Sequence, residues 1–185
     1  MIGIIGAMEV EVALLKAKME NPVTERVSGI DFVRGTLMGQ DVVLAQCGVG
    51  KVFAAVCAQT MIVKFGATII VNSGVSGTLT KDLHIGDVVV ASACVQHDMD
   101  TSPLGDPAGM ISGINRVQLP ADPALIAEFD AVCKAQGVKH LVGIIATGDQ
   151  FIASDAKRRW IVETFGAVTG EMESGAVAQV AYINQ

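Results

Sequence analysis

Residues 2–12 read IGIIGAMEVEV and residues 168–177 read VTGEMESGAV, and these two stretches set the fold class. Each begins with a short strand-like run, continues through glycine and glutamate, and opens a segment with helical periodicity. Such segments place side chains at the carboxyl edge of a parallel sheet, where open α/β folds bind ligands. Three more glycine-marked turns of the same kind lie between them. The pattern predicts a small-molecule enzyme whose site is assembled from several loops.

Strand-like and helix-like segments alternate along the whole chain. Strands are predicted over residues 2–6, 32–37, 42–46, 69–72, 87–96, 141–146 and 168–171, and helices over residues 8–19, 51–65, 123–136, 154–165 and 174–183. This alternation is typical of layered α/β proteins. We expect a single three-layer α/β/α domain over residues 1–185, built around a mixed, mostly parallel twisted sheet and without internal repeats.

The composition excludes several classes of protein. The 185 residues are 51% hydrophobic, yet no uncharged apolar run approaches the roughly 18 residues of a membrane span. We expect the apolar surplus to line a sheet buried on both faces and a subunit interface. The net charge of −6 argues against binding to nucleic acid. The chain starts directly on a strand, without a basic and apolar leader, which predicts a cytoplasmic protein.

The sequence predicts neither a metal site nor a dinucleotide cofactor. The four cysteines are Cys47, Cys57, Cys94 and Cys133. They have neither CxxC spacing nor a suitably spaced histidine, so we expect reduced, mostly buried thiols. The stretch His97-Asp98-Met99-Asp100 has too few ligands for a metal and predicts a polar loop entry. The spacing from Gly3 to Gly6 is not that of the GxGxxG fingerprint.

Residues 97–119 lack periodicity and are rich in proline and glycine. An irregular stretch of this length inside a compact domain is usually a functional lid or an interface loop. Together with the apolar surplus, it predicts a homodimer.

Three carboxylates and one aromatic ring are the candidates for chemistry, and each also has a structural interpretation. Glu11 lies in the first turn of its helix, where it either complements the helix dipole or serves as a general base. Glu171 and Glu173 face opposite ways on an extended backbone, so one can point into a cleft while the other braces a neighbour. Phe151 is either core or, in its polar loop, a stacking surface for a purine.

Taken together, six motifs resemble those of the 5′-methylthioadenosine/S-adenosylhomocysteine nucleosidases, within the nucleoside phosphorylase superfamily. They lie in the family's order at residues 2–12, 48–52, 71–77, 84–90, 148–152 and 171–176. The resemblance implies a nucleoside phosphorylase-like fold and hydrolysis of an N-glycosidic bond, as in methionine salvage, giving adenine and a 5-thioribose product. It implies no cofactor or metal. It also implies a homodimer in which the neighbour's loop helps to close the site.

The resemblance also assigns roles by position. Glu11 would activate water, and Glu173 would hold the ribose hydroxyls above Met172. Phe151 would stack on the adenine, and the backbone of Ile152 would read the edge of the ring. The implied substrate-binding residues are Met8, Val49, Val75, Ser76, Gly77, Phe151, Ile152, Glu171 and Met172. Carboxylates around the sugar stabilise a cationic, oxocarbenium-like transition state more than the neutral substrate.

Charge favours water over phosphate as the nucleophile. A phosphorylase normally holds phosphate with arginines beside its glycine loops. Here the first turn offers Glu9 and Glu11, and no arginine lies near residues 74–77 in the sequence. The carboxylates would repel a phosphate dianion.

Two departures from the family's pattern bear on activity. Many relatives have serine in place of Val75, so a hydroxyl near the attacking water is missing or comes from Ser76. The family's chain continues past the position of Gln185 into a strand with an arginine and a Ser-Asp pair, whose aspartate protonates the leaving adenine. We therefore expect either that the sequence is incomplete at its C-terminus or that the chain is inactive as it stands.

Three other functions remain open at this point. The first is a related hydrolase that acts on futalosine or aminodeoxyfutalosine. The second is a catalytically inactive adenine-nucleoside binder. The third, a nucleoside phosphorylase, is the weakest because of the charge argument.

Overall fold

The computed structural model describes residues 1–185 and contains two compact units. The first unit comprises Met1–Val75 and Gln179–Gln185, and the second comprises Ser76–Ala178. Each unit has its own five-stranded sheet. None of the helices is both long enough and apolar enough to cross a membrane.

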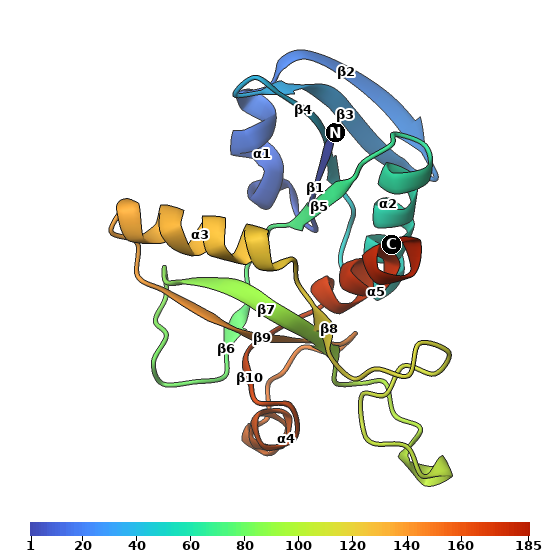
Figure 1. The fold of residues 1–185 in the computed structure, drawn as a ribbon, viewed down its shortest axis with the longest axis vertical. Helices are drawn as coiled ribbons and strands as arrows, with labels where there is room; N and C mark the ends of the chain where they lie inside the picture. Colours follow the sequence, from blue (N-terminus) through green and yellow to red (C-terminus); the bar gives the residue numbers. More distant parts are fainter. The chain divides into compact units, whose positions relative to one another are not determined.

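The sheet of the first unit is parallel at its centre and antiparallel toward one edge (Figure 1). The strands are β1 (Ile2–Gly6), β2 (Glu20–Val27), β3 (Ile30–Leu37), β4 (Gln40–Gln46) and β5 (Ile69–Asn72), in the order β2-β3-β4-β1-β5. Strand β1 runs parallel to both β4 and β5. The carboxyl ends of these three strands therefore meet at one edge of the sheet.

Helices α1 (Glu9–Ala17) and α2 (Lys51–Val63) pack on opposite faces of β1. Ile2 and Ile4 pack in one cluster with Val12 of α1. Gly3 points the other way, and a Cβ atom on it would lie 2.8 Å from the sulfur of Met61 in α2. Because successive residues of a strand face opposite sides, β1 is covered on both faces. The first unit is thus a three-layer α/β/α arrangement by itself.

The sheet of the second unit has a parallel centre and short antiparallel edges. The strands are β6 (Gly77–Thr78), β7 (Val88–Gln96), β8 (Leu119–Pro120), β9 (His140–Thr147) and β10 (Ala167–Glu171), in the order β6-β10-β9-β7-β8. Strand β9 runs parallel to β7 and to β10. Strand β6 runs antiparallel to β10, and β8 runs antiparallel to β7.

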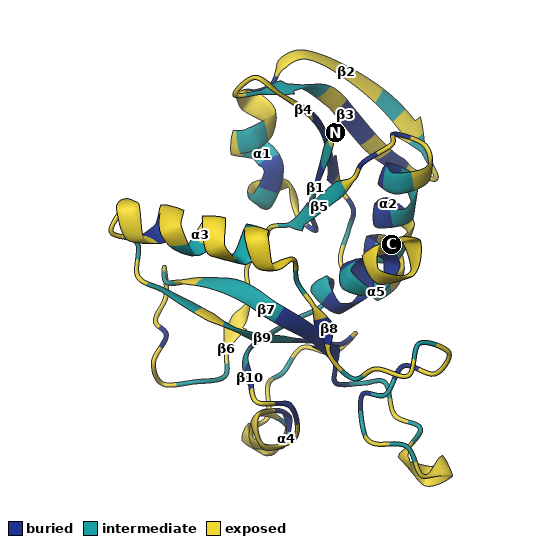
Figure 2. Ribbon diagram, viewed as in Figure 1, coloured by how far each residue is buried: buried dark blue, intermediate teal, exposed yellow.

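Helices α3 (Pro123–Ala135) and α4 (Asp155–Phe165) lie on opposite sides of this second sheet (Figure 1). Ile161 and Phe165 of α4 pack on Val95, Ala146 and Ala167 from three neighbouring strands. Figure 2 shows the outer side of α4 exposed. The remaining helices are the short 3-10 helix η1 (Ser102–Leu104) and α5 (Ser174–Asn184).

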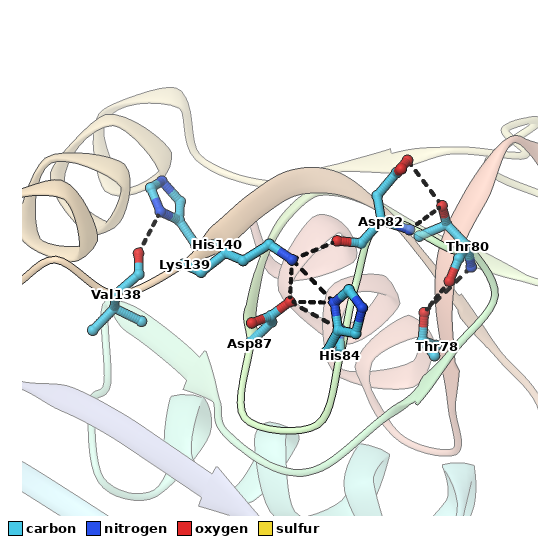
Figure 3. A network of polar contacts seen from close by, with 8 residues as sticks. All are labelled: Thr78, Thr80, Asp82, His84, Asp87, Val138, Lys139 and His140. Atoms are coloured by element: carbon cyan, nitrogen blue, oxygen red, sulfur yellow. Dashed lines mark hydrogen bonds and ion pairs between the residues drawn. The ribbon is translucent and has the colours of Figure 1, made fainter.

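A polar network orders the connection between β6 and β7 (Figure 3). The Lys139 ammonium lies 2.9 Å from the Asp87 carboxylate and donates to the Asp82 carbonyl at 2.8 Å. The same ammonium lies 3.1 Å from Nδ1 of His84, whose backbone N–H donates to Asp87 at 2.8 Å. This network ties the connection to the residue that precedes β9.

The structure confirms the α/β class and the phosphorylase-like fold, and it adds three strands. Strands β6 and β8 have only two residues each, and β2 is mostly exposed without the alternation that predicts a strand. The strands form two sheets rather than one, because β5 pairs only with β1 and β6 pairs only with β10. All four cysteines are buried thiols, as expected. A single domain over residues 1–185 stays a prediction.

Candidate active site

The Glu11 carboxylate is fixed by backbone donors at the carboxyl edge of the first sheet. Its Oε2 atom accepts hydrogen bonds from the N–H groups of Ala7 at 2.7 Å and Met8 at 2.9 Å. Its Oε1 atom accepts from the N–H of Val75 at 2.9 Å. Glu11 is the N3 residue of α1, so its bond to Met8 forms half of a capping box. The carboxylate therefore caps its own helix and also reaches the turn after β5.

Glycine at position 74 is required for this arrangement. A Cβ atom there would lie 2.7 Å from Glu11 Oε1 and 3.0 Å from its carboxyl carbon. Contacts under 3.0 Å do not occur with real Cβ atoms, so any side chain would displace the carboxylate. The turn is anchored just before this point by the hydrogen bond from Ser73 N–H to the Ile5 carbonyl, at 2.8 Å.

A second loop lies beside the loop that carries Met8. Backbone N–H groups of Cys47 and Gly48 donate to the carbonyls of Gly6 and Ala7, at 2.9 and 3.1 Å. These bonds bring the turn with Val49 alongside the start of α1. Met8, Val49 and Val75 are all exposed apolar side chains. The first unit therefore presents apolar surface from three loops around one fixed carboxylate.

In the second unit, Glu171 braces the turn that follows β10. Its Oε1 atom accepts a short hydrogen bond from the Thr147 hydroxyl. Its Oε2 atom accepts from the N–H groups of Glu173 at 2.9 Å and Ser174 at 2.7 Å. Both carboxylate oxygens are thus engaged by the protein. The Glu173 side chain starts from the same turn and is buried, with 9% of the residue exposed.

The Cys94 thiol interacts electrostatically with Glu171 of this turn and is unreactive. Burial, and in second place the charge of Glu171, raises the pKa of the Cys94 thiol to about 12. The thiolate is the nucleophilic form of cysteine, so this residue is inert at neutral pH.

The loop with Phe151 and Ile152 is anchored at its start. Gly148 N–H donates to the Glu171 carbonyl at 3.1 Å, and Asp149 N–H donates to the Asp98 carboxylate at 2.8 Å. The Ile152 side chain packs against Gly170 of β10. Phe151 next to it is 88% exposed. The face of the ring is therefore open for stacking.

Comparison with known proteins decides the family. The family model of the phosphorylase superfamily matches residues 1–185. The 5′-methylthioadenosine/S-adenosylhomocysteine nucleosidase of Shewanella halifaxensis is 38% identical over 182 residues, which cover 98% of this chain and 79% of the relative. The chain belongs to this nucleosidase family of the phosphorylase superfamily.

Solved structures of similar proteins have the same fold as this chain. The S-adenosylhomocysteine nucleosidase of Streptococcus pyogenes, in complex with 5-methylthiotubericidin, is 36% identical with a TM-score of 0.95, covering 99% of this chain and 78% of that one. A futalosine hydrolase mutant of Helicobacter pylori is 33% identical with a TM-score of 0.94, covering 99% of this chain and 83% of that one.

The residues predicted for the nucleosidase site are found in two sets. Met8, Glu11, Val49 and Val75 belong to the first unit, and Ser76, Gly77, Phe151, Ile152, Glu171, Met172 and Glu173 belong to the second. Within the second set, Gly77 pairs with Gly170 across β6 and β10, and Ile152 packs on the same glycine. Ser76 is exposed and Met172 is half-buried.

Sequence reasoning missed the role of Thr147 and placed Asp98 only in a polar loop entry. Both hold loops through hydrogen bonds that depend on strand register, since Thr147 pairs with Glu171 across β9 and β10. For Thr147, the only signal in the sequence was a hydroxyl residue directly before Gly148-Asp149. The structure contains no group of three or more His, Cys, Asp or Glu side chains that is placed to hold a metal ion.

Proposed function

We propose that this protein hydrolyses the N-glycosidic bond of 5′-methylthioadenosine and S-adenosylhomocysteine, and releases adenine and the 5-thioribose product. Membership in the nucleosidase family supports this function. The observation that carries it is the Glu11 carboxylate, held by three backbone N–H groups where parallel strands β1 and β5 end.

Glu11 acts as the general base for the attacking water. An ionised carboxylate has about four lone-pair positions for hydrogen bonds. Two backbone donors occupy Oε2 and one occupies Oε1, which leaves a position on Oε1 for a proton of water. A general base must lie within hydrogen-bond reach of the proton it removes and keep that geometry. The three N–H donors supply the fixed geometry.

Other residues of the predicted site bind the nucleoside in this proposal. Glu173 holds the ribose hydroxyls, Met172 packs beneath the sugar, and Ser76 and Gly77 line the turn after β5. Phe151 stacks on the adenine while the backbone of Ile152 reads its edge. Glu171 braces the turn through three hydrogen bonds, which leaves a position on its Oε1 for a group of the substrate, as at Glu11. The charge of Glu173 favours a sugar that becomes cationic as the base departs.

Water, and not phosphate, is the nucleophile in this proposal. The two arginines of the first unit are engaged elsewhere: Arg26 pairs with Asp31 at 3.1 Å, and Arg34 lies 6.0 Å from the centre of the Phe65 ring. Glu9 and Glu11 occupy the first turn of α1 instead. A phosphate dianion would face negative charge there.

A substrate panel tests the proposal. Purified protein is incubated with 5′-methylthioadenosine, S-adenosylhomocysteine and futalosine, with and without phosphate, and the release of free base is followed. Adenine release that does not depend on phosphate is expected. Release only in the presence of phosphate would identify a phosphorylase, and tight binding in calorimetry without turnover would identify a nucleoside binder.

Futalosine hydrolysis is the second candidate, supported by the similarity to the Helicobacter pylori futalosine hydrolase. The ratio of kcat/KM on futalosine to kcat/KM on 5′-methylthioadenosine separates the two candidates. A ratio above one would replace the first assignment with the second.

We also propose that the protein is a cytoplasmic homodimer. Val52, Val56 and Val63 of α2 are exposed, and their spacing places them on one face of the helix. An uncovered apolar stripe of this kind is typical of an interface between subunits. The four buried thiols accord with a reducing compartment.

A further inference from the structure

We propose that Thr147 is a positioning residue whose hydroxyl sets the direction of the Glu173 side chain by holding the turn over residues 171–175. The inference rests on the proposed function, in which Glu173 binds the ribose. Thr147 itself need not touch the substrate, because it acts through Glu171 and the backbone of the turn.

The Thr147 hydroxyl joins two groups that would otherwise be unpaired. It donates to Glu171 Oε1 and accepts from the N–H of Gly175 at 2.7 Å. Thr147 is fully buried, and its bond to Gly175 is buried as well. A buried polar group that loses its hydrogen-bond partner destabilises the fold. The hydroxyl therefore links the end of β9, the end of β10 and the first turn of α5.

Glu171 connects the Thr147 hydroxyl to the backbone of Glu173 through its two carboxylate oxygens. With Oε1 held by Thr147, its Oε2 accepts from the N–H of Glu173 and of Ser174. On the other side of the same residue, the Glu173 carbonyl accepts from Ala176 N–H at 2.9 Å and Val177 N–H at 3.1 Å. The backbone of Glu173 is thus fixed at its N–H and at its carbonyl.

The packing at Gly175 leaves no room for the turn to shift toward Thr147. A Cβ atom on Gly175 would lie 2.9 Å from Thr147 Cβ and 3.0 Å from its hydroxyl oxygen. The same atom would lie 2.9 Å from Cγ of Gln96, whose side-chain amide donates to the Gly175 carbonyl at 3.3 Å. Loss of the hydroxyl therefore removes the bonds to Glu171 Oε1 and Gly175 N–H, while the bond from Gln96 to the Gly175 carbonyl stays in place.

Two variants separate the hydroxyl from the shape of the side chain. Thr147→Val keeps the branched shape and removes the hydroxyl, whereas Thr147→Ser keeps the hydroxyl. We expect Thr147→Val to lower kcat/KM on 5′-methylthioadenosine about 10- to 100-fold, since a displacement near 1 Å can cost about 100-fold. Thr147→Ser should stay within about threefold of the wild type.

Ligand binding provides a readout that a general loss of stability would not move. Adenine lacks the ribose, so Thr147→Val should weaken 5′-methylthioadenosine at least tenfold and change adenine affinity less than twofold. In a Glu173→Gln background, Thr147→Val should weaken the binding of 5′-methylthioadenosine by less than a further threefold, because the effect of Thr147 passes through Glu173. Equal weakening of both ligands, or a kcat/KM within twofold of the wild type, overturns the inference.

Hydrogen exchange keeps this test independent of the proposed function. The amides of Glu173, Ser174 and Gly175 should exchange at least tenfold faster in Thr147→Val and at the wild-type rate in Thr147→Ser. Unchanged exchange in Thr147→Val overturns the positioning role whatever the activity. If the wild type cleaves no nucleoside, the proposed function fails, and the exchange rates alone decide whether Thr147 holds the turn.

Discussion

The N–H of Val75 donates to the Glu11 carboxylate at 2.9 Å, although the two residues are 64 positions apart in the chain. This bond joins the turn after β5 to the first turn of α1. It is the only one of the three backbone bonds to Glu11 that does not come from Glu11's own helix start. The helix start alone would cap α1, and the bond to Val75 additionally fixes the carboxylate against the turn after β5.

Replacing Glu11 with glutamine should remove most of the activity. An amide is not a base, and general-base catalysis contributes about 10²- to 10⁴-fold. Glutamine also has one acceptor oxygen where the carboxylate has two, so either the Val75 donor or the pair from Ala7 and Met8 loses its partner. We expect kcat for adenine release to fall by about 10²-fold or more and the unfolding free energy to fall by about 1–3 kcal/mol.

Glu9→Gln is the matched control for Glu11→Gln. It removes the same charge from the same helical turn, and the backbone donors that hold Glu11 stay in place. Adenine release should remain within about threefold of the wild type. Equal losses in the two variants would mean that the helix start, and not the Glu11 carboxylate, supports the reaction.

Gly74→Ala should reduce activity and lower the unfolding free energy by no more than Glu11→Gln does, about 1–3 kcal/mol. The new Cβ atom would lie 2.7 Å from Glu11 Oε1, so the carboxylate must move. A shift near 1 Å of a reacting group can cost about 100-fold in rate. Ser73→Ala, one position earlier, leaves the backbone bond to Ile5 intact and serves as the control. Adenine release and thermal unfolding of both variants check the prediction, and full activity in Gly74→Ala would contradict it.

Much of the candidate site was predictable because its parts are local in the sequence. Glu11 follows a buried strand within its own helix turn, and the alternation at Glu171 and Glu173 indicated that one carboxylate braces while the other is directed elsewhere. The structure identifies Glu171 as the bracing residue. The alternation alone did not distinguish the two, because the bond to Thr147 depends on the pairing of β9 with β10.

The parts that sequence reasoning missed depend on contacts between distant segments. The donor at Val75 follows from the register of β5 on β1, where Asn72 lies opposite Ile5. Periodicity reports which face of one segment is buried, and it carries no information about which strand lies next to it. The division of the strands into two sheets was unpredictable for the same reason.

The ion pair between His140 and Asp130 should make stability depend on pH. Nε2 of His140 lies 2.8 Å from the Asp130 carboxylate, and Nδ1 lies 3.1 Å from the Val138 carbonyl. The hydrogen bond with Asp130, followed by the bond with the Val138 carbonyl, raises the pKa of His140. The stabilisation that protonated His140 provides is therefore complete below about pH 6.5, the pKa of histidine in the unfolded chain. It is lost as pH rises through the pKa of His140 in the folded protein.

Asp130 determines how the same ion pair responds to acid. Hydrogen bonds from Lys134 and His140 lower the pKa of Asp130. The stabilisation from Asp130 is therefore present above its pKa in the unfolded chain and is lost as pH falls through its pKa in the folded protein. The difference in Tm between the wild type and His140→Gln should be larger at pH 6 than at pH 9. A difference that is constant across this range would show that the imidazolium does not stabilise the fold.

Charges on the exposed face of α2 should dissociate the proposed homodimer. Val52 is 74% exposed, and Val56 and Val63 follow it on the same helical face. An aspartate at both positions 52 and 56 would bury two unpaired charges in an interface, which costs several kcal/mol. We expect light scattering to give the mass of a dimer for the wild type and of a monomer for the Val52→Asp, Val56→Asp variant. Leu14→Asp changes a side chain on α1 that is equally exposed, at 77%, and should leave the mass unchanged. A monomeric wild type at working concentration would refute the dimer, and dissociation by Leu14→Asp would move the interface to α1.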